Sequence, residues 1–171
     1  MKFSIQVVLE NERVKLVPVV EDDFEELYEV ASDRKIWEQH PNSDRWQRSV
    51  FKKFFDGALE SRGAFKVIDK ESGKVAGCTR YYNYNEQSQC IYIGYTFLSA
   101  NYWGQGINSA VKKLMLDYIF QFLDTVYFQV GANNIRSQIA MARIGAKLSE
   151  KMPDEGSILY ELSRNNLPNG M

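Results

Sequence analysis

The sequence predicts a mixed α+β fold, in which about four helices flank a central mixed, mostly antiparallel sheet of six to seven strands. Three observations predict it. Segments with apolar residues at every second position alternate with segments of helical spacing. Three strand-like segments follow one another between residues 64 and 98, joined by short turns that are typical of an antiparallel meander. A glycine-containing loop and a helical segment then lead into another strand, a connection that requires a right-handed crossover.

The first half of the chain predicts one strand and two helices. Residues 13–19 form the strand, and Pro18 suits a sheet edge or a strand end. Acidic residues crowd the start of 21–32, where the helix dipole favours them, and apolar residues recur there at spacings of three and four. Residues 37–46 interrupt this pattern with a proline and an Asn-Ser-Asp cluster, and a second amphipathic helix follows over 47–61.

The second half begins with the meander strands 64–70, 75–84 and 90–98, which the turns ESGK and NEQSQ separate. After the glycine loop, a helix is predicted over 106–122 and a buried strand over 125–130. A short helix follows over 134–146, capped by Asn134 and ended near Gly145. Two closing strands are predicted at 147–152 and 158–163, and we expect the tail, 164–171, to be loose.

Composition and charge suit one ordinary globular domain spanning residues 1–171, with 44% hydrophobic residues, 25% charged residues and a formal net charge of −1. The balanced charge argues against a nucleic-acid-binding protein, and the basic pairs Lys52-Lys53 and Lys112-Lys113 are interpreted as solvated helix faces. No apolar run reaches the ~20 residues of a membrane span, and acidic residues come too early in the chain for a secretory signal. We therefore expect a cytoplasmic protein with neither nucleic acid nor a membrane as a partner.

Cys78 and Cys90 are the two cysteines. They fall in the two arms of a predicted hairpin that turns near residues 85–88, so Cys78 faces the far end of its partner strand while Cys90 lies close to the turn. A disulfide between them would be out of reach. Two free thiols in a chain without an export signal favour the cytosol.

The stretch YWGQGINSAVKKLM, residues 102–115, places Gly104 and Gly106 at a helix start, although glycine costs roughly 1 kcal/mol against alanine in a helix. A helix N-terminus offers unpaired N–H groups and a partial positive charge, and glycines let a phosphate come close. The loop therefore predicts a phosphate site without a lysine, and a turn that merely lets helix and sheet pack closely explains the glycines equally well. No Gly-Lys-Ser/Thr follows, and Ser109 stands where a dinucleotide fingerprint needs its third glycine.

Two further segments accompany this loop. Residues 134–146, NIRSQIAMARIGA, have the form Asn-x-x-Ser…Gly-Ala, carried by Asn134, Ser137 and Gly145-Ala146. The strand before the loop contains the tripeptide Ile-Gly-Tyr at 93–95.

With these three segments the chain resembles the GNAT superfamily of N-acetyltransferases, and more closely its branch of ribosomal-protein N-terminal (alanine and serine) acetyltransferase-like proteins. The family's loop has the form Arg/Gln-x-x-Gly-x-Gly/Ala, and this branch often uses the variant Tyr-Trp-Gly-x-Gly. In this chain Trp103 stands at the first defined position of the family's loop, Gly106 at the central glycine and Asn108 at the final small residue. The resemblance extends from Val14 to Leu162, and the predicted order of elements is that of the family.

The resemblance implies acetyl-coenzyme A as acetyl donor and no metal. The sheet would splay between the fourth and fifth strands, 90–98 and 125–130, where the pantetheine arm would pair with the backbone of Phe97 and Leu98. Asn134 would lie near the arm or the thioester, unless it is only a helix N-cap. The implied cofactor-binding residues, with the pyrophosphate on the N–H groups of 103–108, are Phe97, Leu98, Trp103, Gly104, Gln105, Gly106, Ile107, Asn108, Ser109, Asn134 and Ser137.

The implied chemistry is direct attack of a neutral amine on the thioester, with a backbone N–H near Phe97 stabilising the oxyanion and a proton donor for the leaving thiolate. Many relatives donate that proton from a tyrosine where this chain has Met141, and Ser137 takes this role in the resembling branch unless it only bonds to backbone. Many relatives carry a glutamate base where this chain has Tyr92, whose phenol is a poor base at neutral pH. Tyr92 is then a candidate catalytic residue or a packing residue, and a water chain or another carboxylate would act as the base.

The resemblance leaves the acceptor amine open among a ribosomal protein, another protein terminus, an antibiotic and a polyamine. A weak base favours an α-amino group, which is roughly 10–15% neutral at pH 7, over a lysine, which is below ~0.1% neutral. The acceptor is expected to lie between the first two helices and the sheet. The candidate residues around it are Trp37, His40, Trp46, Tyr82 and Tyr84.

Two rival functions remain beside the N-acetyltransferase: a catalytically silent acyl-coenzyme A-binding module, and a scaffold or oligomerisation domain that binds no cofactor. Met141 and Tyr92 favour the first rival. No His/Cys cluster or carboxylate spacing indicates a metal site. Relatives often pair as dimers, and the sequence leaves a homodimer open.

Overall fold

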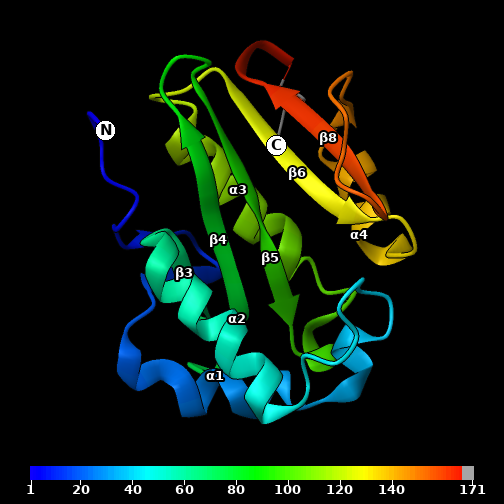
Figure 1. Cartoon of the computed structure of the whole chain (residues 1–171). Coiled ribbons are helices and arrows are strands. Elements are labelled where there is room, and N and C mark those ends of the chain that lie inside the picture. Colours follow the sequence, from blue (N-terminus) through cyan, green and yellow to red (C-terminus); the bar gives the residue numbers. More distant parts are fainter. Residues whose placement is uncertain (167–171) are drawn as a thin grey trace.

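The computed structural model describes residues 1–166, in which the strands form one sheet of order β1-β2-β3-β4-β5-β6-β8-β7 (Figure 1). All neighbouring strands are antiparallel except β5 and β6, which run parallel. The strands are β1 (Leu9–Glu10), β2 (Val14–Pro18), β3 (Ala64–Asp69), β4 (Val75–Asn85), β5 (Cys90–Leu98), β6 (Thr125–Gly131), β7 (Lys147–Leu148) and β8 (Ser157–Ser163).

The predicted mixed, mostly antiparallel sheet is therefore confirmed, with two differences at its edges. The described residues contain eight strands, because Leu9–Glu10 adds a two-residue edge strand that is too short to show an alternating pattern. The strand predicted over 147–152 is only Lys147–Leu148. After Ser149, whose N–H still bonds to the carbonyl of Leu159, the chain leaves the sheet as a loop.

Four α-helices lie within residues 1–166, and none of them is both long and apolar enough to cross a membrane. The 3-10 turns Glu21–Asp23, Arg34–Trp37, Ala100–Tyr102 and Arg164–Asn166 complete the described elements. The helices are α1 (Phe24–Ala31), α2 (Arg48–Ser61), α3 (Ile107–Ile119) and α4 (Ile135–Arg143).

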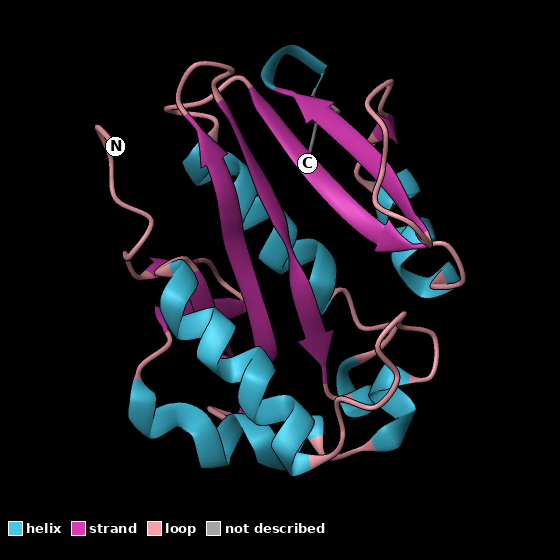
Figure 2. Ribbon diagram, in the orientation of Figure 1, coloured by secondary structure: helices cyan, strands magenta, loops and turns pink. Residues whose placement is uncertain are grey.

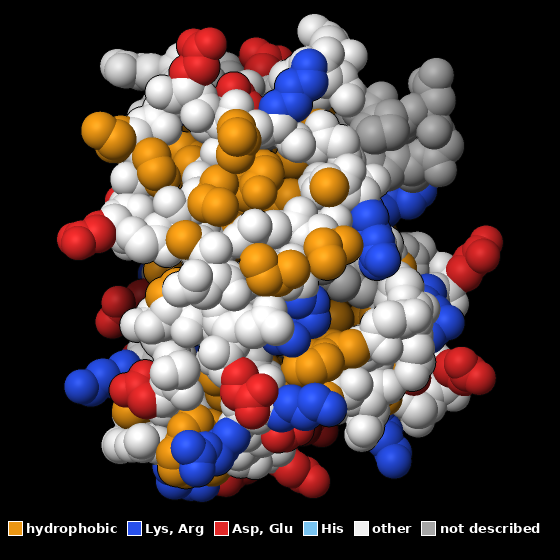
Figure 3. Space-filling model, turned by 90° about the vertical axis from the view of Figure 1, so that its right-hand side faces the viewer, with side chains coloured by type: hydrophobic (Ala, Val, Ile, Leu, Met, Phe, Trp, Pro, Cys, Tyr) orange, Lys and Arg blue, Asp and Glu red, His pale blue; other side chains and the backbone are white. Residues whose placement is uncertain are grey.

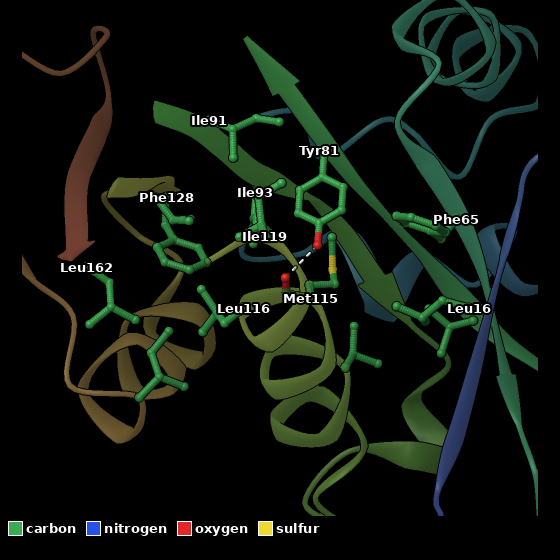
Figure 4. Close-up of a cluster of buried hydrophobic side chains, with 14 of the residues drawn as sticks. Leu16, Phe65, Tyr81, Ile91, Ile93, Met115, Leu116, Ile119, Phe128 and Leu162 are labelled. Atoms are coloured by element: carbon green, nitrogen blue, oxygen red, sulfur yellow. Dashed lines mark hydrogen bonds between the residues drawn. The ribbon is translucent and has the colours of Figure 1, made fainter. Parts of the chain in front are cut away.

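The helices cover both faces of the sheet: α2 crosses in front of it and α3 lies behind it (Figure 2). The strands make this possible because their side chains alternate between the two faces. Cys78 and Phe97 pack into a cluster with α1 and α2. Tyr81 and Ile93 pack into the larger cluster with α3 and α4. Figure 4 shows this larger cluster, in which the buried Tyr81 hydroxyl donates to the carbonyl of Met115 on α3.

The predicted splay lies between β5 and β6, the fourth and fifth strands of the predicted order. Their ladder contains the pairs Cys90–Thr125, Ile91–Val126 and Tyr92–Tyr127 and then stops, and the two strands diverge (Figure 1). Beyond Tyr92, β5 is also irregular on its other side, where its register with β4 shifts and Tyr95 takes a positive φ of 52°. Among the described residues, the edge of β5 that faces β6 therefore has no strand partner from Ile93 to Leu98.

Both cysteines are buried free thiols, as expected: Cys78 pairs with Phe97 at one end of the hairpin, and Cys90 with Asn85 at the other. Of the tail expected to be loose, Arg164–Asn166 forms a 3-10 turn, because the Arg164 guanidinium donates to the carbonyl of Leu123 at 2.8 Å. Residues 167–171 lie outside the described residues.

Candidate functional site

A cleft of about 490 Å³ opens where β5 and β6 separate. Its walls are residues 93–98 of β5, residues 128–131 of β6, and the N-terminal ends of α3 and α4. Residues between 36 and 45, together with Asp154 and Glu155 before β8 and Ser157 at its start, close its rim. The cleft therefore reaches from the side of the sheet that carries α3 and α4 to the side that carries α1 and α2.

Gly104 and Gly106 lie on this cleft with φ angles of +73° and +80°, a left-handed backbone that residues with side chains rarely adopt. A Cβ added at either position would meet no atom within 4 Å. Close packing of the helix on the sheet therefore does not explain these glycines. The glycines are explained by the left-handed conformation of the turn and by the open space in front of it.

The loop also presents free hydrogen-bond donors. Within residues 1–166, no acceptor receives a hydrogen bond from the backbone N–H groups of 104–109; the first bond of the turn is from the Ala110 N–H to the carbonyl of Gly106, at 3.0 Å. The side-chain oxygen of Asn108 is buried and has no hydrogen-bond partner there either. Unpaired donors at the N-terminus of the 13-residue helix α3 are the groups that an anion requires for binding.

Helix α4 brings Asn134 and Ser137 to the opposite wall. Asn134 is buried and is the helix N-cap, because its side-chain oxygen accepts from the Ser137 N–H at 3.2 Å. The Ser137 hydroxyl makes no hydrogen bond to a described residue, so it is available to a molecule in the cleft.

Trp103 connects the glycine loop to its surroundings. Its indole N–H donates to the carbonyl of Leu98 at 3.1 Å, which ties the loop to the end of β5. The Arg136 guanidinium of α4 lies 3.7 Å from the centre of the Trp103 ring and donates to the carbonyl of Ile36 at 3.3 Å. On the side of the molecule that carries β8 and α4, Lys and Arg side chains border hydrophobic ones (Figure 3). This part of the surface combines positive charge with apolar area.

Residues 13–147 match the family model described as the acetyltransferase (GNAT) domain. The chain belongs to the GNAT acetyltransferase family.

Solved structures share the fold of this GNAT chain at low identity. A GCN5-related N-acetyltransferase from Brucella melitensis superposes with a TM-score of 0.78 at 20% identity, covering 94% of this chain and 80% of that chain. The ribosomal-protein-S5-alanine acetyltransferase from Vibrio fischeri gives 0.69 at 18% identity, covering 95% and 99%. Apo FdhC, a nucleotide-linked sugar GNAT, gives 0.71 at 16% identity, covering 94% and 92%.

GNAT proteins use acetyl-coenzyme A, and the residues of this cleft fit that molecule. The open space at Gly104 and Gly106 and the unpaired N–H groups of 104–109 lie where a pyrophosphate would need them. The unpaired edge of β5 offers backbone groups to an extended arm. Within residues 1–166, no three His, Cys, Asp or Glu side chains gather where they could hold a metal ion.

Lys112 of this GNAT chain was interpreted as part of a solvated helix face, and that interpretation is wrong. It is 4% exposed and lines the cleft, whereas its neighbour Lys113 is exposed and pairs with Asp117. The Lys112 ammonium donates to the Thr96 hydroxyl at 2.7 Å, and no carboxylate of the described residues pairs with it. Burial lowers the pKa of Lys112 to about 7. The helix predicted over 106–122 is present as Ile107–Ile119, and its buried face is wider than the apolar pattern indicates.

Two carboxylates line the cleft, Asp154 and Glu155, and sequence reasoning missed both. They lie in the loop before β8, far along the chain from the three family segments, so no local pattern points to them. The Gln129 side chain of β6 donates to the Asp154 carboxylate at 2.8 Å and orients it. The only signal in the sequence was the weakness of Tyr92 as a base, which called for a carboxylate from elsewhere.

Tyr92 itself does not line the cleft. It lies on the last paired rung between β5 and β6, with its ring 5.3 Å from that of Tyr82 and 5.2 Å from that of Tyr127. Burial raises its pKa. This position matches the packing interpretation of Tyr92.

Most of the expected cofactor residues meet at the cleft, with one exception. The Gln105 side chain points away and donates to the carbonyl of Asn101 at 2.6 Å. The expected residues that line the cleft are Phe97, Leu98, Trp103, Gly104, Gly106, Ile107, Asn108, Ser109, Asn134 and Ser137.

The expected acceptor residues divide into two groups. His40 and Tyr82 line the cleft, and burial lowers the pKa of His40 to about 4, with Arg45 and Arg136 adding to the effect. A neutral His40 therefore faces the cleft at pH 7. The other three expected residues do not line the cleft. Trp37 is 1% exposed in the α1–α2 core, Tyr84 packs against Phe3, and Trp46 lies outside the cleft under the Arg34 guanidinium.

Proposed function

We propose that this chain transfers the acetyl group of acetyl-coenzyme A to a primary amine by direct attack in a ternary complex. The observation that carries the proposal is the loop 104–109: unpaired N–H groups and two left-handed glycines at the N-terminus of α3, opening onto the cleft. The Trp103 N–H, expected to belong to this set, instead donates to the carbonyl of Ala100 at 3.2 Å. A pyrophosphate would bind these N–H groups, and the unpaired edge of β5 near Phe97 and Leu98 would hold the pantetheine arm.

The bound donor supplies an activated thioester, and residues of this chain would handle the protons. Asp154, held by Gln129, would accept a proton from the attacking amine. The free Ser137 hydroxyl would donate a proton to the departing thiolate, the role that Met141 cannot fill. A backbone N–H of β5 near Phe97 would stabilise the negative oxygen of the transition state.

The acceptor class we propose is an α-amino group of a protein or peptide. The resemblance of the loop to the ribosomal-protein branch supports it, as does the similar fold of a ribosomal-protein-S5-alanine acetyltransferase. An α-amine is also far more often neutral at pH 7 than a lysine side chain. The names of the structural neighbours include a nucleotide-linked sugar GNAT, so a sugar amine is the second acceptor class to test.

The test combines calorimetry with an assay of free thiol. We expect acetyl-coenzyme A to bind with a stoichiometry of one, and free thiol to appear only when an amine is added, faster with an α-amine peptide than with a lysine peptide. Binding without thiol release from any amine would support the silent module. Absence of binding would contradict both of these functions.

Asp154 and Tyr92 can be separated as candidate bases. We expect Asp154→Asn to lower kcat/KM about 100-fold, because general-base catalysis typically contributes 10²–10⁴-fold. The asparagine keeps an oxygen for Gln129, so the loop should stay in place. Tyr92→Phe removes only a hydroxyl outside the cleft and should change kcat/KM less than threefold. The reverse pattern in steady-state kinetics would assign the base to Tyr92.

A further inference from the structure

We infer that the acceptor amine also carries an anionic group, a carboxylate or a phosphate, and that Arg45 binds this group on the α2 side of the cleft, with the positive charge of the buried Arg80 beside it. The inference rests on the proposed function, because it names the chemical class of acceptor for the same cleft.

Arg45 and Arg80 come from different parts of the chain and meet over the same two aromatic rings. Arg45 lies in the loop before α2 and lines the cleft; its guanidinium is 4.9 Å from the centre of the Phe54 ring and 5.8 Å from that of Tyr95. Arg80 belongs to β4, and its guanidinium is 5.2 Å and 3.9 Å from the same two rings. The two positive groups therefore lie together on the face of the sheet that α2 covers.

Neither arginine is ion-paired to a described residue, although the Asp44 carboxylate next to Arg45 in the chain favours the charged form of Arg45. Within residues 1–166, no carboxylate forms an ion pair with Arg45 or Arg80, whereas the neighbouring Arg48 pairs with Glu25. Arg80 is 6% exposed and donates one hydrogen bond, to the carbonyl of Phe54 at 3.2 Å; its Nε is buried without a partner. Burial lowers the pKa of both guanidinium groups.

A buried cation without an ion-pair partner, such as Arg80, is costly, and the half-buried Arg45 guanidinium beside it raises the cost. The faces of the Phe54 and Tyr95 rings offset part of this cost. An anion entering the cleft would offset more of it, since guanidinium groups bind carboxylate and phosphate with paired, charge-assisted hydrogen bonds. The arrangement therefore favours an anionic ligand over a neutral one.

The two arginines also lie close to the place where the chemistry is proposed. Tyr95, whose ring both of them approach, is the residue of positive φ on β5 within the separated part of the strand. Its ring is 4.9 Å from that of Tyr82, another residue of the cleft wall. Asp154 lies on the other wall, held from β6 by Gln129.

An acceptor in this part of the cleft meets a carboxylate on one wall and a guanidinium on the other. An amine near Asp154 and an anion near Arg45 match these charges, and a purely cationic polyamine does not. The acceptor class is then an amine with a carboxylate or phosphate a few bonds away, either a small molecule or a peptide with an acidic residue beside its N-terminus.

The test compares acceptors that differ only in the anion. The small-molecule pair is O-phosphoethanolamine and ethanolamine. The peptide pair is an alanyl-aspartyl and an alanyl-asparaginyl peptide, both amidated at the C-terminus. Binding is measured by calorimetry with and without saturating coenzyme A, and turnover by thiol release. We expect the anionic member of at least one pair to bind at least tenfold more tightly; the pair that responds shows whether the source is a small molecule or a peptide.

Variants assign the preference to the arginines. Arg45→Gln should bring the affinity ratio of the responding pair close to one while leaving the affinity for coenzyme A unchanged, and Arg45→Lys should retain part of the ratio. Arg48→Gln is the matched control, because it removes the same charge from the start of α2 at an exposed, ion-paired position outside the cleft. It should leave the ratio as it is.

Equal affinities within both pairs, or a ratio that survives Arg45→Gln, would overturn the inference while leaving amine acetylation intact. Loss of coenzyme A affinity in Arg45→Gln would also overturn it, because the arginine would then serve the donor. Tight binding of the anionic amines without any thiol release would support the anion site and contradict the proposed acetyl transfer.

Discussion

Replacement of Gly106 by valine is expected to lower the affinity for coenzyme A at least 100-fold. The φ of +80° strains any residue with a side chain, and a β-branched one most. The added side chain would also project into space that is open to the cleft, in front of the unpaired N–H groups of 104–109. It would occupy the approach of the pyrophosphate, and isothermal titration calorimetry would measure the loss.

Gly73 offers a matched control for this substitution. It has a φ of +74° and nothing within 4 Å of an added Cβ, but it lies in the turn between β3 and β4, outside the cleft. Gly73→Val should lose a similar amount of stability, about 1–2 kcal/mol for a side chain in the left-handed region, and keep its affinity for coenzyme A. Thermal unfolding of both variants would verify the match. Equal affinities in Gly73→Val and Gly106→Val would contradict the role of the loop.

Replacement of Lys112 by methionine is expected to raise the free energy of unfolding at pH 6–7 by about 2–4 kcal/mol, because a buried ammonium without a counter-charge is replaced by an apolar chain of similar shape. The difference between the pKa of about 7 in the folded protein and the ordinary 10.5 corresponds to ~5 kcal/mol at most. The Thr96 hydroxyl keeps its partner, Thr79, 2.9 Å away. Urea unfolding at several pH values would measure the change.

The pH dependence of this effect has a definite sign. The folded-state pKa of Lys112 is below its unfolded value, so between about pH 7 and pH 10.5 the unfolded chain binds more protons than the folded one. The free energy of unfolding of the wild-type protein should therefore rise with pH through this window, and the destabilisation should be fully present below pH 7. In Lys112→Met this contribution to the slope should disappear.

Lys113 provides the control, since it is the next residue on the same helix, exposed and paired with Asp117. Lys113→Met should change the free energy of unfolding by less than about 0.5 kcal/mol and leave the slope with pH unaltered. A Lys112→Met protein that is less stable than the wild type at pH 6 would show that the folded protein favours the charged lysine. One that keeps the wild-type slope would show that burial does not lower the pKa of Lys112.

Local patterns along the chain were enough to predict the alternation of strands and helices, the antiparallel meander and the crossover after the glycine loop. They were also enough to point to the segments that meet at the cleft. Gly104 and Gly106 are required by the backbone conformation of their own turn, and Asn134 caps the helix that begins beside it. Features of this kind depend on residues within a few positions of one another, so the printed sequence already contains their physical cause.

The charges of the cleft could not be predicted in the same way. Asp154 enters from the loop before β8, Arg45 from the loop before α2, and Lys112 from a helix face whose apolar pattern stops short of it. Trp37 was expected near the acceptor, and Tyr92 was left open between catalysis and packing; both lie in packed clusters. Burial and distance between such residues depend on where β5 and β6 separate and on which loops close over the gap. Contacts between different elements of the fold set these quantities, and such contacts produce no periodic pattern in the sequence.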